Sequence, residues 1–369
     1  VWTPAQLTEA IGTMNALVFG AAYGVTHAGN FEHGTSVLSR VTPRVSVGEE
    51  EQLAELRATL HAARERRVRP GTDDKVLAGW NGLAIAGLVR AWEATGHAPA
   101  LALAERAARF LRDRMIAGDA STSASPSAAL RGSGQPALAI ARVFHGGVVK
   151  ALDGTLEDYA FVADGFQRLA EATGDRAWWD LAARLVATAR ATFVGEDDGV
   201  VVCYLAPAGD ALLPHRPESH QDGALPSGAA VLMRALVRLG HVAGDDDAMK
   251  LAERYLVQRL AGATSAGTAW ANSALHGVLD LYLHGQVVVI PDGTGRDALL
   301  RALRTTYAPT AMLAGPWAAA SVLEAKTASP AGEARAFVCT GPTCAAPVTE
   351  PAALAQLLAP RSAGGDTAS

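Results

Sequence analysis

The 369-residue sequence has few cysteines, few aromatic residues and no long apolar run. Three cysteines do not provide a disulfide framework, so we expect a reducing, cytoplasmic setting. No uninterrupted apolar stretch reaches the roughly 18 to 20 residues that span a bilayer. The net charge of -5 and the lack of a Lys- or Arg-rich block argue against a surface for nucleic acid or anionic membranes. The sequence therefore predicts a soluble protein that binds neither.

Hydrophobic residues make up 49% of the chain, which is enough for a large core. The chain begins at Val1 without an initiator Met and without the charged and apolar regions of a secretory signal. We therefore expect it to be a piece of a longer polypeptide.

One stretch, residues 72–90, shows the main pattern of the chain: TDDKVLAGWNGLAIAGLVR. Its polar residues gather at one end and the following turns are apolar on nearly every face, which predicts a buried helix. One interpretation is that Asp74 caps this helix and Asn81 satisfies a neighbouring backbone group. The other is that chemistry takes place at this helix mouth.

Mostly apolar helices recur along the chain, and each is followed by a helix with one polar face, which predicts stacked helical hairpins. Two β-branched runs near the end, QVVVIPDG and RAFVCTG, predict short strands of a small α/β appendage. We expect an all-α body at residues 1–285, with a flexible insertion at residues 117–136. The appendage follows at residues 286–360 and a disordered tail at residues 361–369.

Six motifs occur in order: VWTP, YGVTHAGNFEHGTSVL, TDDKVLAGWNGLAIAGL, LEDYAFVADG, DGALPSG and AFVCTGPTCAAPV. Together, from Val1 to about Leu358, they resemble the thioredoxin-domain proteins related to the spermatogenesis-associated thioredoxin-like protein. The resemblance implies an (α/α)6 barrel similar to six-hairpin glycosidases and N-acylglucosamine 2-epimerases. It also implies a thioredoxin-like domain as a partner, although this sequence lacks the Cys-X-X-Cys site. Position 229 is Ala where the family usually has Asn, so the amide that would reach into the pocket is gone.

In such a barrel the inner helices present their N-terminal ends to one funnel. Glycoside hydrolysis there needs a pair of carboxyl groups, whereas epimerisation or isomerisation needs a base and an acid near neutral pKa, for which His is suited. The candidate catalytic residues are Asp74, Glu157, Asp158, Asp222, His220 and His276. The candidates for binding a sugar-like substrate are Asp73, Trp80, Asn81, Tyr159, Gln221, Ser227, Asn30 and Glu32.

These residues also have structural interpretations. The acids are typical of N-caps or buried ion pairs, His276 of a satisfied core histidine, and Ser227 of a helix cap, because no G-X-S-X-G elbow surrounds it. Cys339 and Cys344 lack nearby His and favour structural thiols over a metal site or a disulfide. No metal site is predicted, and no phosphate loop or dinucleotide fingerprint is present, so we expect no cofactor.

The sequence predicts an enzyme that processes a carbohydrate or a sugar-like small molecule, with epimerase, isomerase or glycoside hydrolase chemistry in an acidic and aromatic funnel. The alternative is a non-catalytic binding or scaffold module derived from a thioredoxin-domain protein, which the Ala at position 229 favours.

Overall fold

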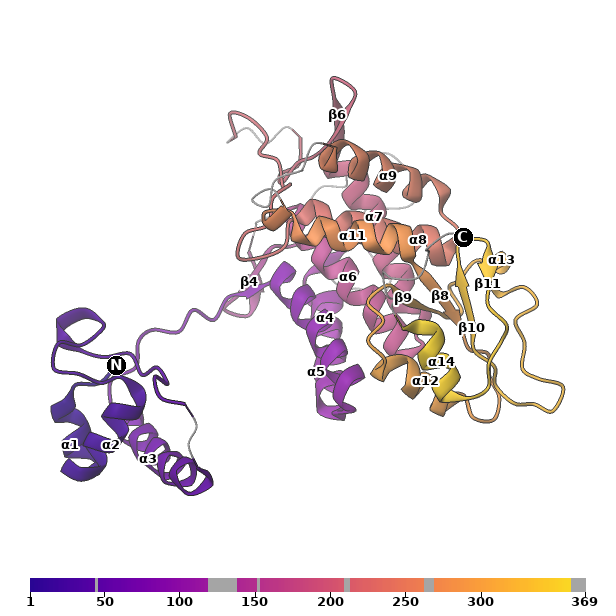
Figure 1. The fold of residues 1–369 in the computed structure, drawn as a ribbon. Helices are drawn as coiled ribbons and strands as arrows, with labels where there is room; N and C mark the ends of the chain where they lie inside the picture. Colours follow the sequence, from indigo (N-terminus) through magenta and orange to yellow (C-terminus); the bar gives the residue numbers. More distant parts are fainter. Residues whose placement is uncertain (44–45, 119–137, 151–152, 209–212, 262–268, 360–369) are drawn as a thin grey trace, which may run out of the picture. The chain divides into compact units, whose positions relative to one another are not determined.

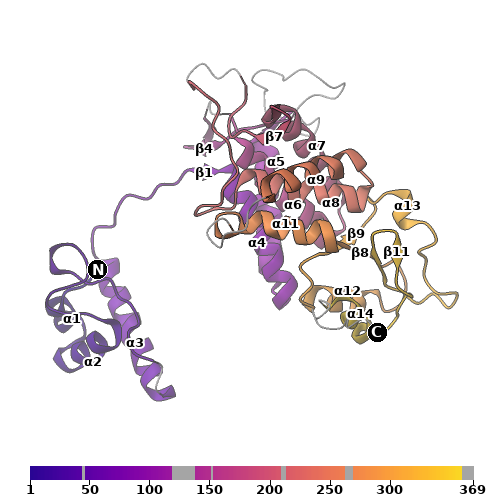
Figure 2. The same ribbon diagram turned by 45° about the horizontal axis from the view of Figure 1, so that its top comes forward.

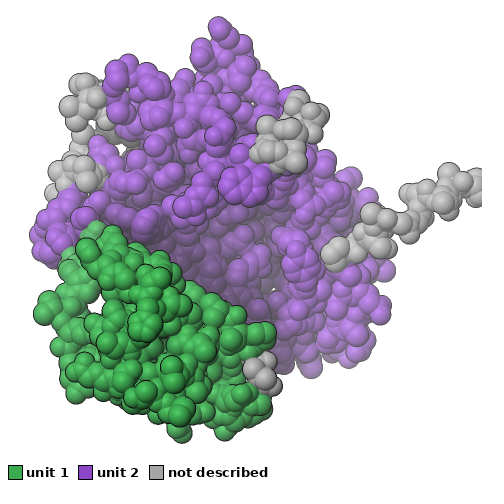
Figure 3. Space-filling view, turned by 60° about the vertical axis from the view of Figure 1, so that its left-hand side comes forward, with its two compact units in different colours: residues 1–74 green, residues 75–369 purple. Residues whose placement is uncertain are grey.

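The computed structural model describes residues 1–43, 46–118, 138–150, 153–208, 213–261 and 269–359 (Figure 1). The predicted flexible insertion, apart from its first two residues, and the predicted disordered tail lie outside the described residues. The chain forms two compact units, Val1–Asp74 and Lys75–Ser369 (Figure 3). The sequence did not predict a division at this place, and the expected boundary at residue 285 stays a prediction. Among the described helices, none is long and apolar enough to cross a membrane.

Unit 1 is a small helical unit. Its helices are α1 (Pro4–Ile11), α2 (Thr13–Tyr23), the 3-10 helix η1 (Glu32–Gly34) and α3 (Val47–Glu65). The apolar spacing of residues 3–22 in the sequence predicts one helix, and this is wrong because Gly12, with a φ of 78°, separates α1 from α2. The sequence of residues 49–68 predicts a surface helix with one apolar stripe, and α3 confirms it, since its leucines are buried against α1 and α2, at Leu53, Leu56 and Leu60.

Unit 2 contains three consecutive helical hairpins, each with an inner helix and an outer helix that carries one polar face. The inner helices are α4 (Ala78–Thr95), α6 (Leu156–Thr173), α8 (Gly228–Ala243) and α11 (Ser273–His284). The outer helices are α5 (Ala98–Arg114), α7 (Arg176–Phe193) and α9 (Asp246–Leu260). The inner helices pack in the order α4, α6, α8 and α11, and each of the first three packs on its outer partner (Figure 2). The predicted mainly α-helical class built from stacked hairpins is confirmed.

Short antiparallel strands connect the hairpins. They are β1 (Val76–Leu77), β2 (Ile116–Ala117), β3 (Ala139–Ile140), β4 (Val143–His145), β5 (Val148–Val149), β6 (Val194–Asp197) and β7 (Val200–Cys203). The hairpin of β4 and β5 was predicted from aliphatic residues around Gly146 and Gly147, and it is confirmed. The hairpin of β6 and β7 was not predicted.

A small sheet follows the last inner helix. Its strands are β8 (Gln286–Val289), β9 (Ala311–Ala314), β10 (Phe337–Thr340) and β11 (Thr343–Cys344), in the order β11-β10-β8-β9, with β8 and β9 parallel. The accompanying helices are α12 (Arg296–Thr305), α13 (Ala320–Leu323) and α14 (Pro351–Leu358). Val288, Leu299 and Leu354 belong to a separate core between the sheet and its helices. The predicted α/β appendage is therefore present.

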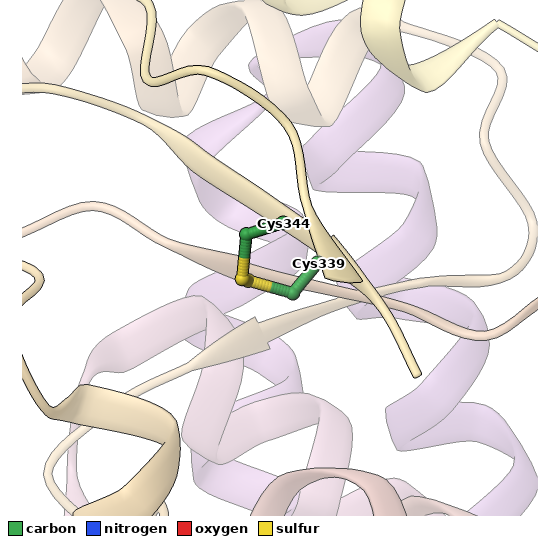
Figure 4. Close-up of a disulfide and its surroundings, with 2 residues drawn as sticks. All are labelled: Cys339 and Cys344. Atoms are coloured by element: carbon green, nitrogen blue, oxygen red, sulfur yellow. A yellow bond between two sulfur atoms is a disulfide. The ribbon is translucent and has the colours of Figure 1, made fainter. Parts of the chain in front are cut away.

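The interpretation of Cys339 and Cys344 as structural thiols is wrong, because the two residues form a disulfide (Figure 4). They lie directly opposite each other on the antiparallel strands β10 and β11, with their Cα atoms 3.9 Å apart. The sequence shows two cysteines five positions apart, but only the hairpin between them brings the sulfur atoms together. Cys203 is a free, buried thiol, and burial raises its pKa to about 12.

Glycines set the distance between α4 and α6. A Cβ at Gly82 would lie 2.5 Å from the carbonyl carbon and oxygen of Phe161, and a Cβ at Gly165 would lie 2.6 Å from the carbonyl oxygen of Gly82. These distances are too short for any side chain, so the two backbones are in direct contact. The first hairpin can therefore pack on the second only with glycine at these positions.

We expect Gly82→Ala to lower the free energy of unfolding by about 1 to 3 kcal/mol, because the added methyl group must push two backbones apart. Gly87→Ala is the matched control on the same helix, since nothing lies within 4 Å of its Cβ position. That substitution should instead stabilise the protein by roughly 0.5 to 1 kcal/mol. Urea unfolding of both variants tests this, and equal effects of the two changes would contradict the close contact.

Candidate functional site

Asp158 joins the N-terminal ends of α4 and α6. Its Oδ1 accepts a hydrogen bond from the Gly79 N–H at 2.9 Å, across the interface between the two helices. Its Oδ2 accepts from Arg142 Nη1 at 2.9 Å, and from the N–H and hydroxyl of Thr155 at 2.9 and 3.0 Å. Only 2% of Asp158 is exposed. Asp158 is not the N-cap of α6, which is Thr155, but it stabilises both helix ends as the third residue of that capping box and as the acceptor for Gly79. Its contact with Arg142 confirms the predicted buried ion pair.

Asp222 makes an equivalent link between α8 and α11. Its Oδ1 accepts from the Ser227 N–H at 2.9 Å, and its Oδ2 accepts from the Ala274 N–H at 2.7 Å and from Ser273 Oγ at 3.2 Å. Ser227 in turn caps α8, because its hydroxyl accepts from the Ala230 N–H at 3.1 Å. The interpretation of Ser227 as a helix cap is confirmed.

The N-terminal ends of α6 and α8 are also in close contact. A Cβ at Gly228, the first residue of α8, would lie 3.1 Å from Glu157 Cγ and 3.1 Å from Ser219 Oγ. The Gly228 N–H also donates to Ser219 Oγ at 3.0 Å. The N-terminal ends of α4, α6, α8 and α11 therefore lie side by side. We call this row of four helix ends the rim.

Glu157 differs from the two other acids of the rim. It is half-buried and accepts no hydrogen bond from another described residue. Burial raises the pKa of its carboxyl, Arg142 opposes this shift, and the negative charge of Asp158 adds to it. Glu157 is therefore a carboxyl of the rim whose pKa is raised and whose oxygens are available to a ligand.

Two exposed indoles lie on the rim. Trp80, in the first turn of α4, is 60% exposed, and Trp270, just before α11, is 80% exposed. Ser273 connects Trp270 to the rim, because its hydroxyl contacts both the Trp270 carbonyl oxygen and Asp222. Trp80 was predicted from the sequence and Trp270 was not. An aromatic residue directly before an inner helix is the pattern that could have indicated Trp270.

The remaining candidate residues, His220, His276 and Gln221, lie at the same end of the helices. Gln221 is exposed, and His220 Nδ1 lies 3.4 Å from a carboxylate oxygen of Glu218. His276 is half-buried, and its Nδ1 lies 2.8 Å from the Asn272 carbonyl oxygen of the preceding turn. That contact fits the predicted satisfied histidine, whereas His220 has a side chain that solvent reaches.

Tyr159 is a structural residue of α6, the inner helix of the second hairpin. Its hydroxyl donates to the Leu138 carbonyl oxygen at 3.2 Å and accepts from the Ile140 N–H at 3.2 Å. Burial raises the pKa of this phenol, and the Ile140 N–H opposes the shift. Both functions of the hydroxyl are used by the backbone, and its predicted contact with a substrate stays a prediction.

The start of α4 differs from the prediction. The helix begins at Ala78 with Leu77 as its N-cap, so the interpretation of Asp74 as the cap is wrong. Asn81 donates to the Leu77 carbonyl oxygen at 2.9 Å, which confirms that it satisfies a neighbouring backbone group. The residues just before this helix form strand β1, which pairs with β4.

Four predicted site residues belong to unit 1. Asp73 and Asp74 are exposed at its end, and Glu32 is exposed in η1. Asn30 braces its own loop, since its side chain donates to the Val37 carbonyl oxygen at 3.1 Å and accepts from the Val37 N–H at 2.7 Å. Their place in the substrate site stays a prediction.

Within the described part of the chain, no group of three or more His, Cys, Asp or Glu side chains is placed to hold a metal ion. The side chains of the rim offer groups for proton transfer and hydrogen bonding. Stacked helical hairpins define a mainly α-helical protein, and the polar and aromatic rim at one end of them is its candidate functional site.

No family model matches the chain. It is 30% identical to human spermatogenesis-associated protein 20 over 319 residues, which are 82% of this chain and 38% of that protein. It is 34% identical to the mouse protein of the same name over 194 residues, 52% of this chain and 23% of that protein. The chain is a homologue of part of spermatogenesis-associated protein 20, as its motifs predicted, and spans about two fifths of the human protein's length.

Among solved structures, a selenomethionine derivative of the GH76 alpha-mannanase of Bacteroides thetaiotaomicron resembles the chain. The TM-score is 0.40 at 15% sequence identity, over 70% of this chain and 68% of the mannanase. Such values describe a distant likeness.

We expect Asp222→Asn to lower the free energy of unfolding by about 1.5 to 3 kcal/mol, because the amide nitrogen cannot accept a charge-assisted bond from a helix N–H. Asp280→Asn is the control on α11, since Asp280 is exposed and contacts only His284 among the described residues. The control should change stability by no more than about 0.5 kcal/mol. Chemical denaturation measures both, and an Asp222→Asn protein as stable as the parent would remove the link between α8 and α11.

Proposed function

We propose that the helical unit 2 binds a sugar-like small molecule at the rim and processes it by proton transfer through Glu157. The supporting observation is the state of that carboxyl: it is half-buried, its pKa is raised by burial, and its oxygens accept no hydrogen bond from another described residue. A general acid must retain its proton near the working pH, and burial shifts the pKa of Glu157 in the direction that this role requires.

The neighbours of Glu157 suit a sugar. Trp80 and Trp270 expose indole faces on the same row of helix ends, and aromatic faces pack against the apolar side of a pyranose. His220 supplies a second group that can exchange a proton. It lies near Glu157 because the preceding residue, Ser219, contacts Gly228, which packs against Glu157. A carboxyl and an imidazole form an acid and base pair of the kind that epimerisation or isomerisation needs.

The hydrogen bonds of the two aspartates favour this chemistry over hydrolysis by a pair of carboxyl groups. Hydrolysis requires one protonated and one ionised carboxyl on either side of the glycosidic bond. Asp158 and Asp222 each use both oxygens on helix N–H groups and neighbouring donors. These bonds hold both carboxylates to the helix ends, which favours a structural role for them over attack on a sugar.

A non-catalytic binding module is the second candidate, and Ala229 is the observation that favours it. The residue is wholly buried in α8, so it presents no polar group to the rim where the resemblance implies an amide. In this candidate the rim binds its ligand without turnover, and a thioredoxin-like domain is the partner served.

The Glu157→Gln variant separates the two candidates. It removes the proton and keeps the shape, so turnover of a sugar substrate should fall by about 100-fold to 10,000-fold while binding persists. Glu105→Gln on the outer helix α5 is the control, because Glu105 pairs only with Arg109 and lies away from the rim. The measurement is a turnover screen of epimerisable sugars, together with calorimetric binding. Turnover that survives Glu157→Gln would exclude Glu157 as the acid.

The same variant has a test that needs no substrate. Because the folded state raises the pKa of Glu157 above its ordinary value of 4.5, the folded protein binds more protons than the unfolded chain just above that pH. Stability from this group is therefore present at low pH and falls as pH rises through the folded pKa. Glu157→Gln should gain stability relative to the parent between about pH 4 and pH 7, and a constant difference across that range would contradict the raised pKa.

A further inference from the structure

A cavity of about 420 Å³ lies at the other ends of the inner helices, away from the rim. It is formed by the last turns of α4 and α6 and by the segment that runs from α12 into β9. Its charged and hydroxyl-bearing lining residues are Arg90, Glu93, Glu171, Arg304, Thr306 and Tyr307. Its apolar lining residues include Leu303 and Leu313. The volume lies within the range of pockets for small metabolites.

Two guanidinium groups reach this cavity. Arg90 contacts Glu93, with Nη1 2.8 Å from a carboxylate oxygen, and keeps about half of its side chain exposed. Arg304 lies with its guanidinium 4.2 Å from the centre of the Trp92 ring, and its one hydrogen bond to a described residue is the 3.5 Å contact with the Ala172 carbonyl oxygen. Both cations therefore retain donors for a ligand.

A network of ion pairs lies behind the cavity wall. Asp164 accepts from Arg234 at 2.9 Å and from Arg168 at 3.2 Å, and Arg238 pairs with Glu171. Burial alone would raise the pKa of Asp164, but Arg168, Arg234 and Arg238 together lower it, so this carboxyl is ionised.

We name this network and the two cavity arginines the arginine cluster, which comprises Arg90, Arg168, Arg234, Arg238, Arg304, Glu93, Asp164 and Glu171. Five cations meet three carboxylates, which leaves an excess of two positive charges. Arg238 is only 2% exposed, and its Nε has no hydrogen-bond partner within the described structure. Arg238 is buried, whereas Arg90 is exposed and lines the cavity with Arg304, so an anion in the cavity would lie against the excess positive charge and compensate it.

We propose that this cavity binds a small organic oxyanion of sugar size, a carboxylate or a phosphate monoester, whose charged end lies between Arg90 and Arg304. Guanidinium groups bind both oxyanions by paired hydrogen bonds. The hydroxyls of Thr306 and Tyr307 suit the polar part of the molecule, and Leu303 and Leu313 cover its apolar face. This site is separate from the rim and does not depend on the function proposed there.

Calorimetric titration of the chain tests the proposal with inorganic phosphate, glucose 6-phosphate, gluconate and glucose as probes. We expect glucose 6-phosphate or gluconate to bind and glucose not to bind. A comparison of the affinities for glucose 6-phosphate and gluconate shows whether the site prefers a phosphate or a carboxylate. Arg304→Gln and, separately, Arg90→Gln should each weaken the binding at least tenfold. Arg301→Gln is the matched control, because Arg301 is exposed on the same helix α12, and it should leave binding unchanged.

The proposal is overturned if none of the three anionic probes binds, or if glucose binds as tightly as glucose 6-phosphate. It is also overturned if the folded Arg90→Gln and Arg304→Gln proteins bind the anion like the parent, since the arginines then only neutralise helix C-terminal ends. Glu157→Gln must retain anion binding in full. A failure of the rim as an active site therefore leaves this result unaffected, and the two proposals fail separately.

Discussion

The arrangement of the inner helices depends on backbone N–H groups that carboxylates of neighbouring helices satisfy. The first N–H groups of any helix lack partners within that helix. Here Asp158 accepts a hydrogen bond from one such N–H group of α4, and Asp222 accepts one from α11. Each carboxylate thereby binds the N-terminal end of a neighbouring helix and fixes the spacing of two inner helices. Direct contact of α4 and α6 at Gly82 and Gly165 depends on the same alignment.

This constraint distributes the charged groups along the helices. Glu157 and Asp158 lie in the first turn of α6, where the helix dipole favours carboxylates, whereas Arg90 and Arg304 lie at the cavity near the opposite ends. Because Asp158 and Asp222 are occupied, Glu157 remains as the acid of the rim with accessible oxygens. At the opposite ends, Arg90 and Arg304 add positive charge that the helix dipoles and the three carboxylates of the arginine cluster do not balance. The two proposed sites thus follow from one arrangement of helices.

Periodicity predicted the helices well, because the outer helices α5, α7 and α9 each bury one face in the core. It could not predict features set by contacts distant in sequence. The break at Gly12 needs a left-handed backbone, the division after Asp74 depends on which helices pack together, and the disulfide depends on the β10–β11 hairpin. In the candidate site, the sequence indicated polar residues at the helix ends, but the partner of Asp158 is Gly79, 79 positions away, and no local pattern reveals such a bond.

Amide hydrogen exchange of Gly79 and Ala274 tests the central claim most directly. Both N–H groups lie in the first turns of helices, where exchange is ordinarily fast because no acceptor is present. The first turn of α5 is the internal reference, since no side chain caps it. We predict that Gly79 and Ala274 exchange far more slowly than that turn, at rates close to those of the helix interiors. Exchange of both amides as fast as that of the α5 reference would contradict the account.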